Sequence, residues 1–171
     1  DFFPQDKVII TDAHQYLLDH FKEFDFIWSS PPCPSHSRAR FWGSFGENKT
    51  KIYPDMRLYQ EVIFLQHYGK KIKWIIENVI PYYEPLIKGQ KSGRHLFWAN
   101  FYIKEIDSKT MFFPKDSLPT LEKIYGVKLP KLDIDIDKRV ILRNMVEPEL
   151  GLHIFNCAFG RLQQPTLLTQ D

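Results

Sequence analysis

Two side chains in this 171-residue chain are suited to covalent chemistry, a cysteine and a glutamate that each follow a short apolar run. Cys33 lies in the segment 29–35 (SSPPCPS), directly after the apolar run 26–28, and Glu77 follows the apolar run 74–76. A thiolate is a strong nucleophile, and a carboxylic acid can donate or remove a proton in the same reaction. The pair therefore predicts a site in which Cys33 attacks and Glu77 handles a proton.

Three short apolar runs must position these groups, because runs of this length are typical of strands buried on both faces of a parallel sheet. They occupy residues 8–10, 26–28 and 74–76, and the first of them leads to Asp12. Each predicted strand therefore delivers one reactive or hydrogen-bonding group at its carboxyl end. Open α/β sheets bind ligands along that edge, so we expect an α/β fold with its site there.

Helical patterns separate these runs. Residues 13–21 show helical spacing of apolar side chains, and a second helix is predicted to open at Pro54 and to close at Gly69. The first helix would make a βαβ unit with the strands predicted on either side of it. Residues 35–53 lack apolar periodicity and are expected to form a long loop after Cys33.

The residues around the cysteine and the glutamate resemble two motifs of one enzyme family. Residues 31–33 (PPC), followed by Ser35, resemble the nucleophile motif of the DNA (cytosine-5) methyltransferases, in particular those of bacterial or phage type. Residues 77–79 (ENV) are similar to the acidic motif of the same family. The two motifs together favour this family strongly.

Two weaker matches lie farther along the chain, in the family's order. Gln90 and Arg94 are similar to a Gln-x-Arg-x-Arg motif in which Ser92 replaces the first arginine. Residues 143–148 (RNMVEP) resemble a Gly-Asn-x-Val-Pro-Pro motif, with arginine in place of the glycine and glutamate in place of the first proline. The resemblance therefore spans most of the chain.

The resemblance implies the Rossmann-like fold of S-adenosylmethionine-dependent methyltransferases, an α/β sheet with helices on both faces. It divides the chain into a catalytic core at 1–100, a small insertion at 101–138 and a C-terminal segment at 139–171 that returns to the core. The insertion resembles a target-recognition region and contains mixed charges, three prolines and one short helical candidate at 121–125.

The activity that the resemblance implies is methylation of carbon 5 of a cytosine flipped out of duplex DNA, with S-adenosylmethionine as the methyl donor. Cys33 would add to carbon 6 as a thiolate and make carbon 5 reactive. Glu77 would hydrogen-bond to N3, and Arg94 would stabilise negative charge near O2. No side chain stands out for removing the carbon-5 proton, which is assigned to water.

Four residues are implied in binding the cofactor: Asp12, Pro31, Asn144 and Val146. Asp12 resembles the acidic residue that the family places near the adenine amine, and Thr11-Asp12 before a helix is equally an ordinary helix cap. The family's opening strand and Phe-x-Gly-x-Gly turn have no counterpart in the sequence. We expect an N-terminal segment or a second polypeptide to complete the cofactor site.

The loop after Cys33 is expected to contact double-stranded DNA, because it combines cationic side chains with an aromatic ring that could stack on a base. The candidate contacts are Ser35, Arg38, Arg40, Trp42, Lys49 and Lys51. The same residues would equally suit an ordinary solvated surface. His36 is expected either to support the nucleophile or to face a phosphate.

Composition sets broad limits on the function. The formal charge is +2, from 23 basic and 21 acidic residues, and by itself does not indicate nucleic-acid binding. The two cysteines, Cys33 and Cys157, do not make a disulfide framework, and a reducing cytoplasm is the expected compartment. No apolar run approaches the roughly 20 residues that cross a bilayer, so no membrane partner is expected.

Three other functions compete with this prediction. A zinc-dependent deaminase also acts on flipped cytosine, but its Pro-Cys-x-x-Cys element requires a cysteine where the chain has His36. An RNA (tRNA) cytosine-5 methyltransferase would carry the same motifs, and an incomplete cofactor pocket would leave a protein that binds nucleic acid without catalysis.

Taken singly, Cys33 could be a buried apolar group and Glu77 a capping or ion-paired carboxylate.

Overall fold

The structure is a computed structural model, and it describes residues 8–41, 51–106, 117–130 and 137–160. The chain divides into two compact units, Asp1–Tyr102 and Ile103–Asp171. Within the described ranges, no helix has the length and apolar character needed to span a membrane. The first unit contains the predicted nucleophile Cys33 and the predicted acid Glu77.

A four-stranded mixed sheet forms the centre of the first unit, with the strand order β1-β2-β4-β3. β1 (Phe26–Ser29) pairs in parallel with β2 (Lys73–Val79), which pairs antiparallel with β4 (His95–Ala99). β3 (Gln90–Ser92) lies antiparallel to β4 at the edge of the sheet. The open sheet and its helices make an α/β fold, which confirms the predicted class at this level and two of the three predicted strands.

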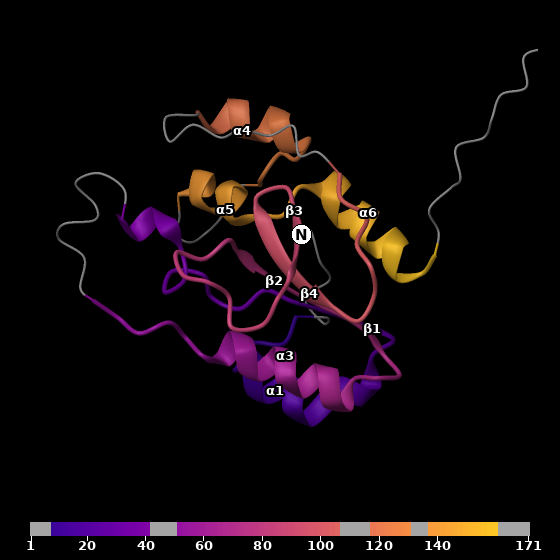
Figure 1. Cartoon of the computed structure of the whole chain (residues 1–171). Coiled ribbons are helices and arrows are strands. Elements are labelled where there is room, and N and C mark those ends of the chain that lie inside the picture. Colours follow the sequence, from indigo (N-terminus) through magenta and orange to yellow (C-terminus); the bar gives the residue numbers. More distant parts are fainter. Residues whose placement is uncertain (1–7, 42–50, 107–116, 131–136, 161–171) are drawn as a thin grey trace, which may run out of the picture. The chain divides into compact units, whose positions relative to one another are not determined.

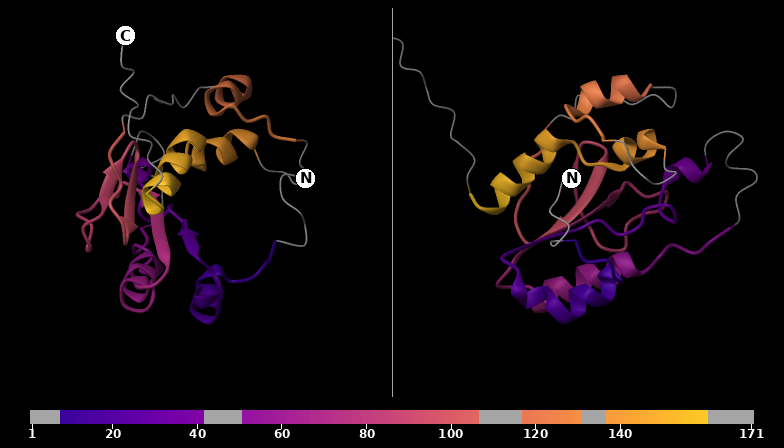
Figure 2. Two further views of the ribbon diagram at one scale, coloured as in Figure 1. Left: turned by 90° about the vertical axis from the view of Figure 1, so that its right-hand side faces the viewer. Right: turned by 180° about the vertical axis from the view of Figure 1, so that it is seen from behind.

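Two helices lie side by side along one face of this sheet (Figures 1 and 2). α1 (Ala13–His20) begins after its cap residue Asp12, and α3 (Arg57–Tyr68) ends at Gly69. Both predicted helices are therefore present, but α3 begins at Arg57 and not at Pro54. A short 3₁₀ helix, η2 (Phe21–Glu23), follows α1. Because α3 connects the parallel strands β1 and β2, these three elements make the βαβ unit of the fold.

The strand register decides which side chains reach the two helices. Ile76 and Trp98 are paired and contribute to the apolar core against α1 and α3. One position along β2, Glu77 is paired with Phe97 on the opposite face, where His95 also lies. The buried residues of the core are Phe21, Ile27, Leu58, Tyr59, Val62, Leu65, Trp74, Ile76, Leu96 and Trp98. The carboxyl group of Glu77 is therefore kept out of this core.

The strand predicted at residues 8–10 is wrong. Val8, Ile9 and Ile10 belong to no strand, and the residues are 55%, 62% and 97% exposed. A strand needs a neighbour for its backbone hydrogen bonds, and among the described strands β1 is the last on its side of the sheet. The βαβ unit expected around α1 is therefore wrong as well.

The β3–β4 hairpin is a feature that the apolar pattern did not indicate. Its two-residue turn consists of Gly93 and Arg94, and Gly93 has a φ of 57°. Glycine in the first of two turn positions permits the type II′ geometry, which suits the twist of paired strands. β3 spans only Gln90–Ser92 and has no apolar alternation, so periodicity gave no signal for it.

The second unit contains three helices within its described residues. α4 (Leu118–Tyr125) includes the short helix predicted at 121–125, and α5 (Lys138–Asn144) packs against it. α6 (Pro148–Ala158) begins with Pro148, a position at which the missing backbone N–H of proline costs nothing. The buried residues between α4 and α5 are Leu121, Tyr125 and Leu142.

Candidate active site

The segment after β1 holds Cys33 in a tight turn at the carboxyl end of the strand. The carbonyl of Cys33 accepts hydrogen bonds from the backbone N–H groups of His36 and Ser37, at 2.9 and 3.1 Å. Pro31 and Pro32 precede the cysteine and restrict the backbone on that side. The Cys33 thiol is free and half-buried, so the turn presents it without enclosing it fully.

Residues at and beyond the end of β2 hold this turn in place. Asn78 is buried, and its Nδ2 donates to the carbonyl of Pro31 at 2.9 Å. Farther along, the N–H of Tyr82 donates to the carbonyl of His36 at 3.1 Å. The carboxyl ends of the parallel strands β1 and β2 are thus joined at one edge of the sheet, where the predicted site lies.

Glu77 lies close enough to Cys33 for its charge to act on the thiol. Burial raises the pKa of the Cys33 thiol, and the negative charge of Glu77 raises it further. A raised pKa keeps the sulfur protonated at neutral pH, so the thiol is unreactive at rest. The structure therefore brings the predicted nucleophile and the predicted acid into one site.

His95 is a partner of Glu77 that the motifs did not indicate. Its Nδ1 forms a hydrogen bond with Glu77 Oε1, and the two residues are only 5% and 7% exposed. His95 Nε2 is also buried and has no hydrogen-bond partner among the described residues. The one signal in the sequence was a histidine at the start of the segment 95–99, which is otherwise apolar. This signal points to Glu77 only once the β2–β4 register is known.

Arg94, the residue predicted to act near O2, occupies the second position of the β3–β4 turn and is half-buried. It immediately precedes His95, the residue that contacts Glu77. Ser92, which replaces the family's first arginine, is buried and is paired with His95 across the hairpin. The role of Arg94 at O2 stays a prediction.

His36 supports the cysteine turn. Its ring is fully buried, and its Nδ1 lies 2.6 Å from the hydroxyl of Tyr83. Burial lowers the pKa of His36, so the ring is neutral at pH 7, and burial also raises the pKa of the Tyr83 hydroxyl. Because the ring is fully buried, the structure favours the supporting role predicted for His36 over a contact with a phosphate.

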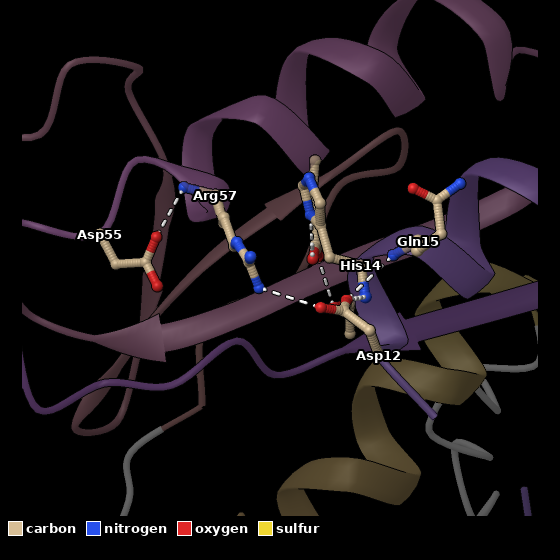
Figure 3. Close-up of polar contacts among 7 residues, drawn as sticks. Asp12, His14, Gln15, Asp55 and Arg57 are labelled. Carbon is tan, nitrogen blue, oxygen red and sulfur yellow. Dashed lines mark hydrogen bonds and ion pairs between the residues drawn. The ribbon is translucent and has the colours of Figure 1, made fainter. Parts of the chain in front are cut away.

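Asp12 caps α1 (Figure 3). Its Oδ1 accepts from the N–H groups of His14 and Gln15, at 2.9 and 3.1 Å, and its Oδ2 lies 3.3 Å from Arg57 Nη1. These donors lower the pKa of the exposed Asp12 carboxyl, led by the N–H of Gln15. The helix-cap alternative is confirmed, and the cofactor role of Asp12 stays a prediction.

A buried carboxylate lies beside this cap. Glu61 on α3 accepts a hydrogen bond from Ser29 Oγ at 2.6 Å, and its other oxygen lies 3.1 Å from His14 Nδ1. The contact joins α1, α3 and the last residue of β1. This network fixes the start of the segment that leads to the cysteine, and no motif had indicated it.

A cavity of about 290 Å³ is lined by residues from α1, β1 and the segments before them. Its volume is close to the lower limit for small-molecule sites, so it suits part of a cofactor such as an aromatic base. The lining residues include Thr11 and Ala13, the neighbours of Asp12. Asn144 ends α5 and Val146 follows it in the second unit, so their predicted share in the cofactor site stays a prediction.

The six candidate DNA contacts differ in their placement. Trp42 and Lys49 lie outside the described residues, and Lys51 is exposed. Ser35 is buried, and its Oγ accepts from the N–H of Asp55 at 3.0 Å. Because this hydroxyl satisfies a backbone group of the loop, the structure favours a supporting role for Ser35 over a DNA contact.

The remaining candidates lie on a short 3₁₀ helix, η3 (Arg38–Phe41). The guanidinium groups of Arg38 and Arg40 donate to backbone carbonyls at 3.0 and 3.4 Å, which fixes η3 to the cysteine turn and to the segment after β2. Phe41 is 63% exposed, and its ring lies 4.8 Å from that of Tyr82. These two aromatic rings form an exposed pair that no sequence motif indicated.

Comparison with known proteins adds no family to this description. No family model matches the chain, and neither does any curated protein or solved structure.

Proposed function

We propose that this chain is a DNA cytosine-5 methyltransferase, which transfers a methyl group from S-adenosylmethionine to carbon 5 of a cytosine flipped out of the duplex. The observation that supports this most directly is that Glu77 lies near enough to Cys33 for its charge to raise the pKa of the thiol, at the carboxyl ends of two adjacent parallel strands. A thiol and a carboxyl group in one site suit a reaction that needs a nucleophile and an acid on the same ring. The resemblance of residues 31–33 and 77–79 to the family's motifs agrees with this reading.

The reaction would begin when the Cys33 thiol loses its proton to water and the resulting thiolate adds to carbon 6 of the cytosine. A carbon–sulfur bond forms, the ring double bonds shift, and N3 takes a proton from Glu77, which is left as a carboxylate. Carbon 5 is now the carbon of an enamine and can attack a methyl group on a positively charged sulfur. Protonation of N3 lowers the barrier because it neutralises the charge that the thiolate brings into the ring.

Carbon 5 would take the methyl group that S-adenosylmethionine supplies, and N3 would then return its proton to Glu77. Water removes the hydrogen from carbon 5, and the electrons of that bond restore the carbon 5–carbon 6 double bond. The carbon–sulfur bond breaks and Cys33 leaves as a thiolate. Arg94, one position before His95, is the proposed source of positive charge near O2.

Duplex DNA is the proposed substrate because the surface next to the cysteine turn suits a flipped nucleotide. Flipping a base costs a few kcal/mol, and contacts that stack on bases or hold phosphates must compensate for it. Phe41 and Tyr82 offer an exposed aromatic pair, and Arg40 and Lys51 supply positive charge from the same part of the chain.

The cavity beside α1 is the proposed place for the adenine part of the methyl donor. It carries aromatic and hydroxyl-bearing side chains that fit a flat base with polar edges, namely Tyr16, Phe26, Trp28, Thr11 and Ser29. When bound, S-adenosylmethionine supplies a methyl group on a cationic sulfur. Asp12 at the start of α1 is the proposed partner of the adenine amine.

A trapping experiment tests this function. The chain is mixed with a duplex that contains 5-fluorocytosine, with and without S-adenosylmethionine, and the products are analysed by intact mass spectrometry. Fluorine at carbon 5 cannot leave as a proton, so the covalent intermediate accumulates. We expect a protein–DNA adduct that requires the cofactor and is absent from Cys33→Ala, whereas Cys157→Ser should form it normally because none of the motifs that resemble the family includes Cys157.

The same assay separates the alternatives. An adduct with 5-fluorocytosine in tRNA but not in duplex DNA would favour an RNA cytosine-5 methyltransferase. Binding of duplex DNA without any adduct, in the presence of S-adenosylmethionine, would favour a protein that binds nucleic acid without catalysis. An adduct that persists in Cys33→Ala would contradict the proposed nucleophile.

A further inference from the structure

The contact between His95 and Glu77 is the feature of the site that no sequence motif accounts for. Both residues are more than nine-tenths buried, and the imidazole Nδ1 bonds to Oε1 of the carboxyl group. Burying a polar ring costs free energy unless its nitrogens find partners, and Nε2 has none among the described residues. Leucine at this position of β4 would avoid that cost, so the histidine calls for an explanation in the chemistry of Glu77.

The hydrogen bond between the two side chains allows two arrangements. Either Nδ1 carries the hydrogen and donates it to Oε1, or Glu77 carries a hydrogen on Oε1 and donates it to Nδ1. In the proposed reaction Glu77 must give a proton to N3 of the cytosine, and the ring of His95 already occupies Oε1. The acidic hydrogen must therefore sit on Oε2, which requires Nδ1 to be the donor.

We propose that His95 is a positioning residue that donates its Nδ1 hydrogen to Glu77 Oε1 and thereby directs the acidic hydrogen of Glu77, on Oε2, toward the cytosine ring. This role rests on the function proposed above. When Glu77 protonates N3, the O–H bond at Oε2 breaks, the N3–H bond forms, and the new carboxylate keeps its hydrogen bond from His95. That bond strengthens as its acceptor becomes charged, so it stabilises the adduct more than the complex in which Glu77 still carries its proton.

The sheet preorganises this donor. His95 is paired with Val79, two positions beyond Glu77 on β2, so the histidine and the glutamate are diagonal neighbours on one face of an antiparallel pair. The ring of Phe97 lies 6.0 Å from the imidazole on the same face. Side chains on paired strands keep their relative positions better than side chains on loops, which suits a hydrogen bond that must be in place before the base arrives.

Nuclear magnetic resonance of the wild-type chain tests the arrangement directly. Long-range ¹H–¹⁵N correlation spectra report which ring nitrogen of His95 carries the hydrogen, and this readout does not depend on methyl transfer. We expect hydrogen on Nδ1 and a bare Nε2 at neutral pH. Hydrogen on Nε2 with a bare Nδ1 would overturn the proposal, because Glu77 would then be the donor.

Three variants of the whole chain test the catalytic consequence. His95→Leu removes the donor, His95→Asn returns an N–H close to the position of Nδ1, and His67→Leu, at an exposed histidine of α3, is the matched control. The single-turnover rate of methyl transfer to DNA should fall about tenfold or more in His95→Leu and recover to within about threefold of wild type in His95→Asn. The control should match wild type.

The outcomes distinguish this role from the function on which it rests. Wild-type activity together with an equally active His95→Leu variant would overturn the role of His95 and leave the methyltransferase proposal standing. Failure of His95→Asn to recover any rate would also overturn it, because a donated hydrogen bond would then not be what the histidine supplies. Absence of methyl transfer to cytosine by the wild type, with the cofactor bound, would refute the proposed function first, and the role of His95 with it.

Discussion

Asn78 is expected to hold the cysteine turn to the sheet, and Asn78→Ala tests this. Its Nδ2 donates to the carbonyl of Pro31 at 2.9 Å, its Oδ1 accepts from the N–H of Val79 at 3.0 Å, and the residue is 1% exposed. Alanine removes both contacts and leaves two backbone groups without these partners. At about 1–3 kcal/mol for each of the two groups left unsatisfied, the free energy of unfolding should fall by about 2–6 kcal/mol.

Asn100 offers a matched control at the other end of β2. Its Nδ2 donates to the carbonyl of Ile72 at 2.6 Å, and its Oδ1 accepts from the N–H of Trp74 at 3.1 Å. The side chain is exposed, so water can replace the contacts that Asn100→Ala loses, and the expected loss is only about 1 kcal/mol. Urea unfolding followed by tryptophan fluorescence measures both variants.

The rate at which iodoacetamide alkylates Cys33 adds a local readout, in a Cys157→Ser background that leaves one thiol. Without Asn78 the turn loosens and the half-buried thiol becomes more accessible, so alkylation should accelerate in Asn78→Ala. It should be unchanged in Asn100→Ala. Equal stability and equal alkylation rates in wild type and Asn78→Ala would refute the reasoning that Asn78 holds the turn.

Two further predictions concern charge and stacking. Glu77→Gln should lower the pKa of the Cys33 thiol because it removes a negative charge that opposes the thiolate. The pH profile of Cys33 alkylation should therefore move to lower pH. An unchanged profile would mean that the charge of Glu77 has no effect on the pKa of the thiol. Phe41→Ala should weaken duplex binding, measured by fluorescence anisotropy, by about 1–3 kcal/mol through lost stacking. Tyr102→Ala, at another exposed aromatic residue, is its control, and an equal loss there would contradict a specific role for Phe41.

The sequence predicted the helices and strands whose buried apolar side chains form a clear pattern along the chain. β1 and β2 are short apolar runs covered by helices, and α1 and α3 carry the helical spacing and the end signals, Asp12 and Gly69, that fix where they begin and end. The placement of Cys33 and Glu77 in one site could also be predicted, because the carboxyl ends of adjacent parallel strands meet at one edge of the sheet.

The remaining features depend on contacts that a single sequence does not show. An apolar run such as 8–10 becomes a strand only when another strand pairs with it, and none of the described strands does so. The β3–β4 hairpin depends on Gly93 and a very short strand, which leave no apolar period. His95 could be connected with Glu77 only through the β2–β4 register, so its importance emerged from the structure alone.

The protonation state of Glu77 affects two steps of the proposed reaction, the attack by Cys33 on carbon 6 and the protonation of N3. An ionised Glu77 raises the pKa of Cys33 and so opposes the thiolate that must attack carbon 6. The same residue must carry a proton if it is to protonate N3. A protonated Glu77 meets both requirements, because it removes the repulsion on the thiolate and holds the hydrogen that the ring needs. A cytosine that accepts a hydrogen bond from Glu77 therefore favours attack by the sulfur and protonation of the ring together. Before the cytosine binds, the thiol stays protonated and unreactive.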